Sequence, residues 1–224
     1  FKIHFVANLL VSLGFIDITD PAAPAPLGAL SLEGEPTSIA IVGTTGYVAV
    51  NTSADYVQTG GALLTLDVGT RQIAATCDLG GQPDSVAVAP DASFLAVAIE
   101  NERDEDLNDG ALPQLPAGYV AIIPIADGAA DCAGMVKAHL TGLAGITAAE
   151  DPEPEFVDVN ANGEIAVTLQ ENNAVAILDR AGKVLSHFSA GTVDLEGVDA
   201  AEDGALRFAE TLTGVPREPD AVQW

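Results

Sequence analysis

A short pattern that returns four times constrains this chain more than any other feature of its sequence. An acid or amide, a proline, two further residues and then Val or Ile occur at 35–39, 82–86, 153–157 and 218–222, as EPTSI, QPDSV, EPEFV and EPDAV. The first three copies open stretches of β-branched runs bounded by Gly, Asn, Asp and Pro, which is typical of short strands joined by turns. Repeats of several short strands predict a β-propeller or a related array.

Each repeat predicts four antiparallel strands. The opening proline suits a first strand residue, where no backbone N–H is needed for strand pairing. Gly and Asn at 43–46 and 162–163 mark tight turns between strands. Four such strands form one propeller blade. In the first repeat the expected strands are 38–42, 47–50, 62–68 and 72–77, and in the third repeat they are 156–159, 165–169, 174–178 and 184–188.

The number of repeats predicts an all-β, partial β-propeller of four-stranded blades, about half of a six- or seven-bladed ring. A complete ring needs roughly 270 to 320 residues, whereas this chain has 224. We therefore expect the remaining blades of the same protein to complete the ring, and an isolated segment to be poorly soluble or to self-associate through its open blade faces. The single domain, 1–224, divides into a blade tail (1–35), three blades (36–82, 83–153 and 154–218) and the start of a next blade (219–224).

Extra residues fall mainly in two segments, 100–118 and 190–217. In a propeller, the loops between the second and third strands and the loops between blades emerge on one face, around the mouth of the central channel. Binding and chemistry are commonly carried by long loops on a rigid scaffold. We therefore expect the functional face of the molecule to be the one that carries these insertions.

The charge excludes some partners. The chain has 33 acidic and 8 basic residues, a formal net charge of −25, which disfavours nucleic acid and anionic membranes. Hydrophobic residues make up 48%, which argues against disorder. Most of the acids also fit a plain alternative, a solvated surface in a salt-adapted protein. No apolar run approaches the about 20 residues of a membrane span.

Cysteines and the N-terminus are less informative. Cys77 and Cys132 permit one disulfide or two free thiols, and both alternatives stay open. The histidines are scattered, so we expect no zinc site. Residues 1–13 carry a short apolar run without an initiator Met or a small-x-small cleavage site. This run predicts a buried strand rather than a signal peptide.

The segment 100–109 holds six carboxylates. Crowded carboxylates repel one another unless a cation neutralises them, and Ca²⁺ takes six to eight oxygen ligands. Alternate residues from Asp104 resemble the start of an EF-hand, but Asp109 replaces the required Gly and no Glu closes the loop. The sequence therefore allows a Ca²⁺ site of another geometry or a solvated acidic loop. The candidate metal ligands are Glu100, Glu102, Asp104, Asp106, Asn108, Asp109, Glu171 and Asp199.

Amide and guanidinium groups on the same face are candidates for substrate binding. Arginine binds phosphate or carboxylate in a bidentate manner, but each Arg also has acidic neighbours to pair with, and Asn is a common turn residue. No P-loop, no GxSxG turn and no Ser, His, Asp set is present, so the catalytic residues are unknown. The candidate substrate-binding residues are Arg103, Asn172, Asn173, Arg207 and Arg217.

Three segments, 100–122, 154–179 and 194–224, resemble a known family. They are similar to the N-terminal propeller portion of secreted or periplasmic bacterial proteins described as esterase-like phytase or alkaline-phosphatase-like, related to the choice-of-anchor I group. The resemblance runs from Gly14 to Trp224 and does not include residues 1–13. It implies an exported propeller, periplasmic or secreted, whose later portion carries the esterase-like phytase region. It supplies no catalytic residues for this segment.

Two functions follow as expectations. The first is a calcium-assisted phosphoesterase, in which the metal polarises a phosphoryl oxygen and activates water, with a small phosphoester bound at the insertion face. The second is a non-catalytic propeller that binds a ligand or partner at the same acidic, calcium-stabilised face. In a third and plainer alternative, the acids serve only solubility.

Overall fold

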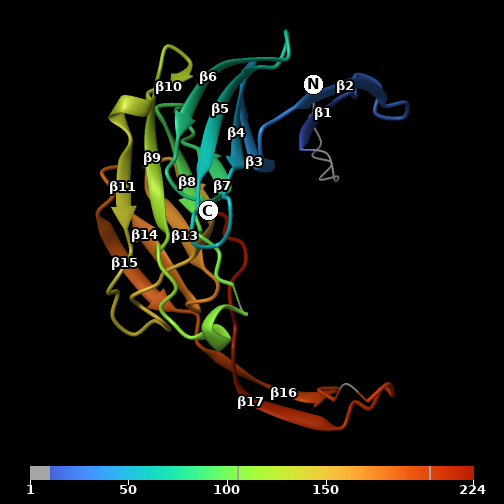
Figure 1. Cartoon of the computed structure of the whole chain (residues 1–224), viewed down its shortest axis with the longest axis vertical. Coiled ribbons are helices and arrows are strands. Elements are labelled where there is room, and N and C mark those ends of the chain that lie inside the picture. The colour runs from blue at the N-terminus through green and yellow to red at the C-terminus, as the bar shows by residue number, and fades with distance from the viewer. Residues whose placement is uncertain (1–10, 105, 202) are drawn as a thin grey trace.

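The computed structural model describes residues 11–104, 106–201 and 203–224, and in these residues the chain consists of antiparallel strands and two short 3₁₀ turns. Three sheets stand side by side as successive blades (Figure 1). This confirms the prediction of an all-β propeller built from four-stranded blades. The first blade has the order β3 (Glu35–Val42), β4 (Thr45–Asn51), β5 (Gly61–Asp67) and β6 (Gln72–Asp78).

The second and third blades repeat this order. In the second blade both β10 and β11 pair with β9, because η2 (Cys132–Gly134) interrupts the outermost strand. The strands of the second blade are β7 (Pro83–Val88), β8 (Phe94–Ile99), β9 (Tyr119–Ala126), β10 (Ala129–Ala130) and β11 (Val136–His139). Those of the third blade are β12 (Pro154–Val159), β13 (Ile165–Leu169), β14 (Ala174–Leu178) and β15 (Val184–Ser189).

The repeated motif begins the innermost strand of each blade. Its proline lies opposite the end of the second strand, and in each blade the strand register shifts directly after that proline. The serine hydroxyls of the motif join neighbouring blades. Ser38 Oγ accepts a hydrogen bond from the backbone N–H of Val86 at 3.1 Å, and Ser85 Oγ accepts one from Val157 at 3.0 Å.

Apolar side chains at alternate strand positions fill the space between blades. Tyr47 and Leu63 of the first blade belong to one buried cluster with Leu95 and Ile123 of the second. A separate cluster joins the second and third blades. A disulfide between Cys77 of β6 and Cys132 of η2 also links the first two blades, which settles the pairing that the sequence left open.

Two hairpins flank the blades (Figure 1). β1 (Ser12–Asp17) and β2 (Ala25–Ser31) pack on the first blade through Leu13 and Phe15. The expected strand at 1–13 is thus described only at its end, because residues 1–10 lie outside the described range. β16 (Thr192–Val198) and β17 (Glu210–Pro216) project from the blades as a two-stranded ribbon.

Residues 219–224, where we expect a next blade to start, form no strand. They still lie against the third blade. Asp220 O accepts a hydrogen bond from Thr168 Oγ1 at 3.1 Å, and Trp224 N donates to Asp158 Oδ2 at 2.8 Å. None of the helical turns in the described part of the chain has the length and apolar character that a membrane crossing requires.

Candidate functional site

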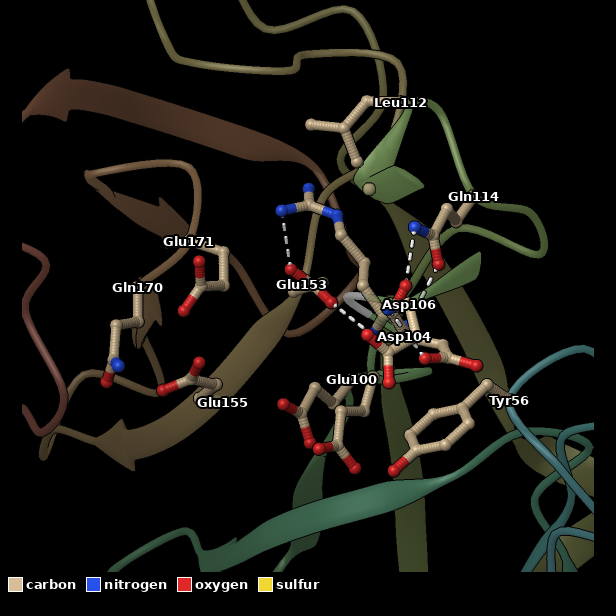
Figure 2. Close-up of a pocket in the computed structure, with 13 residues that line it drawn as sticks. Tyr56, Glu100, Asp104, Asp106, Leu112, Gln114, Glu153, Glu155, Gln170 and Glu171 are labelled. Atoms are coloured by element: carbon tan, nitrogen blue, oxygen red, sulfur yellow. Dashed lines mark hydrogen bonds and ion pairs between the residues drawn. The ribbon is translucent and has the colours of Figure 1, made fainter. Parts of the chain in front are cut away.

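The main pocket lies where the loops between second and third strands converge, and we call it the acidic mouth (Figure 2). Its volume is about 660 Å³. Tyr56 comes from the β4–β5 loop, 100–114 from the β8–β9 loop, and 170–171 from the β13–β14 turn. It is lined by Tyr56, Glu100, Glu102, Arg103, Asp104, Asp106, Gly110, Leu112, Gln114, Glu153, Glu155, Gln170 and Glu171.

Burial and mutual repulsion raise the pKa of three carboxyl groups in this region. Burial, followed by the negative charges of Asp84, Glu155, Glu102 and Glu153, raises the pKa of Glu100 to about 9. Burial, with Asp84 as the largest of the charged neighbours, raises the pKa of Glu155 to about 8. Burial also raises the pKa of Asp84 to about 6, with Asp220 and Glu102 adding to the shift.

Among the described residues, the side chains of Glu100, Glu155 and Asp84 form no hydrogen bond or ion pair, and of the three only Glu100 and Glu155 line the mouth. Glu155 is only 9% exposed, and it lines the mouth with its carboxylate on the side of Gln170 and Glu171 (Figure 2). A buried carboxylate that faces a pocket without a donor or cation is energetically unfavourable. The mouth is therefore suited to a ligand that brings positive charge.

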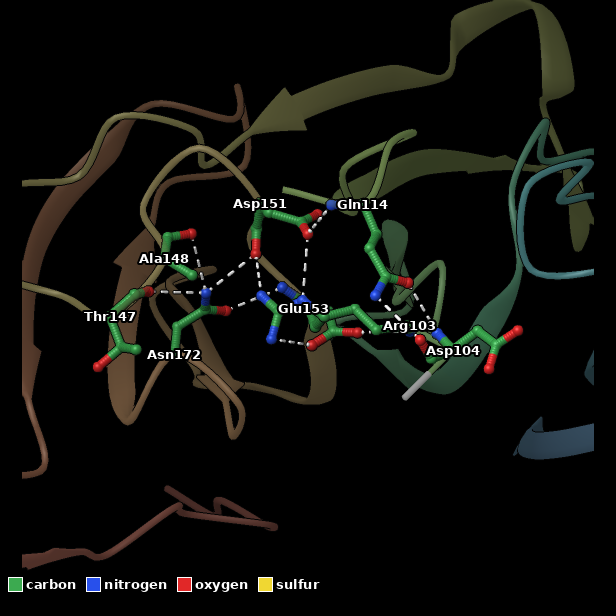
Figure 3. A network of polar contacts seen from close by, with 8 residues as sticks. All are labelled: Arg103, Asp104, Gln114, Thr147, Ala148, Asp151, Glu153 and Asn172. Carbon is green, nitrogen blue, oxygen red and sulfur yellow. Dashed lines mark hydrogen bonds and ion pairs between the residues drawn. The ribbon is translucent and has the colours of Figure 1, made fainter. Parts of the chain in front are cut away.

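Arg103 is the one cation among the described residues that line the mouth, and its charge is already neutralised (Figure 3). Its Nε lies 3.1 Å from Asp151 Oδ2 and its Nη1 lies 2.7 Å from Glu153 Oε2, and both acids are almost fully buried. The backbone N–H of Arg103 also donates to Glu153 Oε1 at 2.7 Å. Burial raises the pKa of Glu153 to about 7 even though Arg103 acts in the opposite direction.

The contacts of Arg103 fix the inserted β8–β9 loop to the start of β12. Gln114 N donates to Asp151 Oδ2 at 2.7 Å, and the Gln114 side chain forms two 2.9 Å hydrogen bonds with the backbone of Asp104. The guanidinium also donates to the Asp151 carbonyl. Arg103 is thus paired with its acidic neighbours, which is one of the two alternatives that the sequence left open. Its role in substrate binding stays a prediction.

Asn172 and Asn173 have the geometry of turn residues. Asn172 Oδ1 accepts the N–H of Glu153 at 2.9 Å, and its Nδ2 donates to the carbonyls of Thr147 and Asp151 at 2.9 and 3.0 Å. Asn173, at φ 50°, accepts from the N–H groups of 217 and 218 and donates to Gly191 O. The side-chain amides of both residues are thus hydrogen-bonded to backbone groups. Their predicted contact with a substrate stays a prediction.

The remaining predicted residues lie elsewhere. Asn108 and Asp109 are exposed in η1 (Leu107–Gly110) and do not line the mouth. Asp199 follows β16, where its Oδ2 accepts the N–H of Arg207 at 3.1 Å, and Arg207 forms an exposed ion pair with Asp203. Arg217 donates to Ala190 O at 3.0 Å at the base of the ribbon.

The structure thus brings together Glu100, Glu102, Asp104, Asp106 and Glu171 around Arg103. In the part of the chain that the structure describes, no three His, Cys, Asp or Glu side chains are arranged to hold a metal ion. The predicted Ca²⁺ site is therefore not preformed, and calcium stays a prediction.

Asp84, Glu153 and Glu155 belong to this acidic region but are not among the residues predicted from the sequence. The signal for two of them is in the repeat itself, because an acid follows the proline in three of the four copies, at Asp84, Glu155 and Asp220. The innermost strands of a propeller border its channel, so acids at equivalent positions of successive blades face one another. Their mutual influence on pKa agrees with this placement.

Comparison with known proteins supports the same fold. The family described as choice-of-anchor I domain matches residues 3–223. No curated protein sequence matches this chain.

Solved structures resemble the chain at low sequence identity. Hydrazine synthase of Kuenenia stuttgartiensis has a TM-score of 0.57 at 15% identity, over 78% of this chain and 47% of that one. A functionally unknown protein from Desulfotomaculum acetoxidans DSM 771 has a TM-score of 0.55 at 11% identity, over 91% of this chain and 64% of that one. The Cps50 (Swd1) β-propeller domain of Myceliophteria thermophila has a TM-score of 0.52 at 14% identity, over 80% of this chain and 53% of that one. These similarities show the fold alone, and this chain spans less than two thirds of each protein.

Proposed function

Because this chain belongs to the choice-of-anchor I domain family, we propose that it is the ligand-binding propeller segment of a surface or secreted protein and that it binds a cation at the acidic mouth. The Cys77–Cys132 disulfide supports a location outside the reducing cytoplasm. Ca²⁺ is the inorganic candidate, because hard oxygen ligands of flexible loops are the ligands it takes.

The observation that carries this proposal is the pair of unpartnered acids, Glu100 and Glu155. Each has a raised pKa because its charged form lacks compensation. A bound cation supplies that compensation, so it takes the place of protons. Binding is therefore expected to release protons at neutral pH and to strengthen as pH rises. A compact ion such as Ca²⁺ requires movement of these side chains to gather enough ligands.

Calcium-assisted phosphoester hydrolysis is a second candidate. It is supported by the resemblance of 100–122 and 154–179 to esterase-like phytase proteins, and by the pKa of about 7 at Glu153 and about 8 at Glu155. Carboxyl groups that titrate near neutral pH are suited to general acid–base catalysis. A metal at the mouth would polarise a phosphoryl oxygen and acidify its bound water.

Calorimetric titration with Ca²⁺ tests the primary proposal. The key variant is Glu100→Gln/Glu155→Gln, and the matched control is Glu196→Gln/Glu210→Gln, which removes two acids from the exposed ribbon. We expect wild type and control to bind equally and the key variant to bind at least about tenfold more weakly, a loss of roughly 1.4 kcal/mol. Titrations in two buffers of different ionisation enthalpy measure the protons released.

Two results oppose these proposals separately. Equal Ca²⁺ affinity in wild type and the Glu100/Glu155 variant contradicts cation binding at the mouth. Ca²⁺ binding without hydrolysis of p-nitrophenyl phosphate by the full-length protein contradicts the phosphoesterase and leaves the binding module.

A further inference from the structure

We propose that the preferred occupant of the acidic mouth is an elongated organic polycation, a linear aliphatic polyamine, rather than a compact metal ion. This inference rests on the proposed function, because it names the ligand class of the same site. Three observations support it: the dispersal of the negative charge, the unpartnered Glu155, and the apolar side chains on the walls.

The negative charge is spread over the mouth. Glu100 comes from the β8–β9 loop, Glu155 from β12 and Glu171 from the β13–β14 turn. Figure 2 shows Glu155 and Glu171 on the side of Gln170, while Glu100 lies on the side of Tyr56. Within the described residues no three acids are arranged closely enough to hold one metal ion. A single small ion reaches few of these charges, whereas ammonium groups spaced along a chain reach carboxylates at separate places. A volume of about 660 Å³ leaves room for such a chain.

Glu155 is the second and independent observation. It is nine-tenths buried, lines the pocket, and has no protein donor within the described part of the chain. An ammonium group donates up to three hydrogen bonds and carries the charge that a carboxylate needs. A ligand ammonium at Glu155 would therefore remove the cost of this unpaired acid.

The walls also carry exposed apolar surface. Tyr56 is 45% exposed and Leu112 is 47% exposed, and both line the mouth. A hydrated Ca²⁺ ion gains nothing from such surface. Methylene groups bury it favourably, and an ammonium group over a tyrosine ring gains a cation–π interaction.

Competition between charge-matched cations tests this inference. Spermidine and hexaamminecobalt(III) each carry three positive charges near neutral pH, but the first is elongated and the second compact. We titrate both, and Ca²⁺, into wild type, Glu155→Gln, Tyr56→Ala and the control Phe208→Ala, which removes an exposed aromatic ring before the ribbon strand β17. Urea unfolding of each variant verifies that it is folded.

We expect spermidine to bind at least about tenfold more tightly than the compact trivalent ion. Tyr56→Ala should lower the affinity for spermidine by about threefold to tenfold and leave the affinity for the compact ion within about twofold of wild type. Glu155→Gln should lower the affinity for spermidine by about tenfold or more, and Phe208→Ala should leave the affinity for each cation unchanged.

Different failures identify different errors. If Ca²⁺ or the compact ion binds as tightly as spermidine, or if Tyr56→Ala leaves spermidine unchanged, the polyamine inference is wrong and cation binding stands. If none of the three cations binds, both the inference and the proposed function are wrong.

Discussion

At the residue scale, Glu100 couples stability to protons. Its pKa lies at about 9 in the folded protein, because of burial and then of Asp84 and Glu155, against an ordinary value of 4.5. Between these values the folded protein holds a proton that the unfolded chain has released. The free energy of unfolding therefore falls as pH rises through this interval. The pKa of Glu155, raised from 4.5 to about 8, has the same effect on the free energy of unfolding over that pH interval.

This sign gives the first prediction. We expect the melting temperature of the cation-free protein to decrease as the pH is raised from about 5 to about 9. Glu100→Gln should flatten this dependence and melt at a higher temperature than wild type at the alkaline end, since the neutral amide needs no proton. Calorimetric scans at several pH values measure both. A wild-type midpoint that rises over this range, or an unchanged slope in Glu100→Gln, contradicts the burial of this carboxyl.

At the element scale, the ion-pair network of Arg103 holds the inserted β8–β9 loop on the entry to β12. The side chains of Asp151 and Glu153 are 1% and 2% exposed, so their charges are compensated by the guanidinium rather than by solvent. Removing one member of a buried pair leaves an uncompensated charge, which is far more costly than the loss of a surface pair. Position 207 offers a matched comparison, because its ion pair with Asp203 is exposed.

The second prediction compares these two arginines. Arg103→Ala should lower the free energy of unfolding by about 3 kcal/mol, and Arg207→Ala by less than about 0.5 kcal/mol. Urea unfolding curves give both values. Similar small losses at the two positions would mean that the network in Figure 3 does not fasten the loop.

The strands and the site were predictable from the sequence to different extents. The blades were predictable because each is a local repeat, with β-branched strands and a motif proline at the same place in β3, β7 and β12. The strand expected at 219–224 is absent in the structure, since a strand needs a neighbour to pair with and these residues contact β12 and β13 only through isolated hydrogen bonds.

The acids of the inserted loop were predictable because they crowd together in the sequence. Glu153 was not, because blade packing, rather than chain proximity, brings it to Glu100, and Glu155 was signalled only by its place after the motif proline. Asn101 and Asn172 illustrate the same limit. Each accepts, at 2.9 Å, the backbone N–H of the residue before a motif proline, at 82 and 153. A polar residue after a strand is a candidate ligand by type, and only the fold shows that its amide is used by the backbone.

At the scale of the whole molecule, stability depends on contacts between successive blades. Residues in such arrays contact only adjacent repeats, so the array is held by its interfaces. The first interface has an apolar cluster and the disulfide between Cys77 and Cys132, whereas the second combines an apolar cluster with the ion pairs of Arg103. The net charge of −25 opposes association of copies at low salt, so the expected self-association of open blade faces stays a prediction, checked by sedimentation at low and high salt.

The third prediction concerns that disulfide. The two cysteines are 55 residues apart, and closing a loop of this length restricts the unfolded chain by about 4 kcal/mol in the chain-entropy model. Cys77→Ala/Cys132→Ala should therefore lower the free energy of unfolding by roughly that amount, measured by urea unfolding. Reductant should destabilise wild type and leave the double variant unchanged, and if reductant leaves wild type unchanged as well, the bond does not stabilise the interface. Neither cysteine lines the acidic mouth, so in the folded variant cation affinity should stay within about twofold of wild type, which separates the interface that holds the blades from the site that they carry.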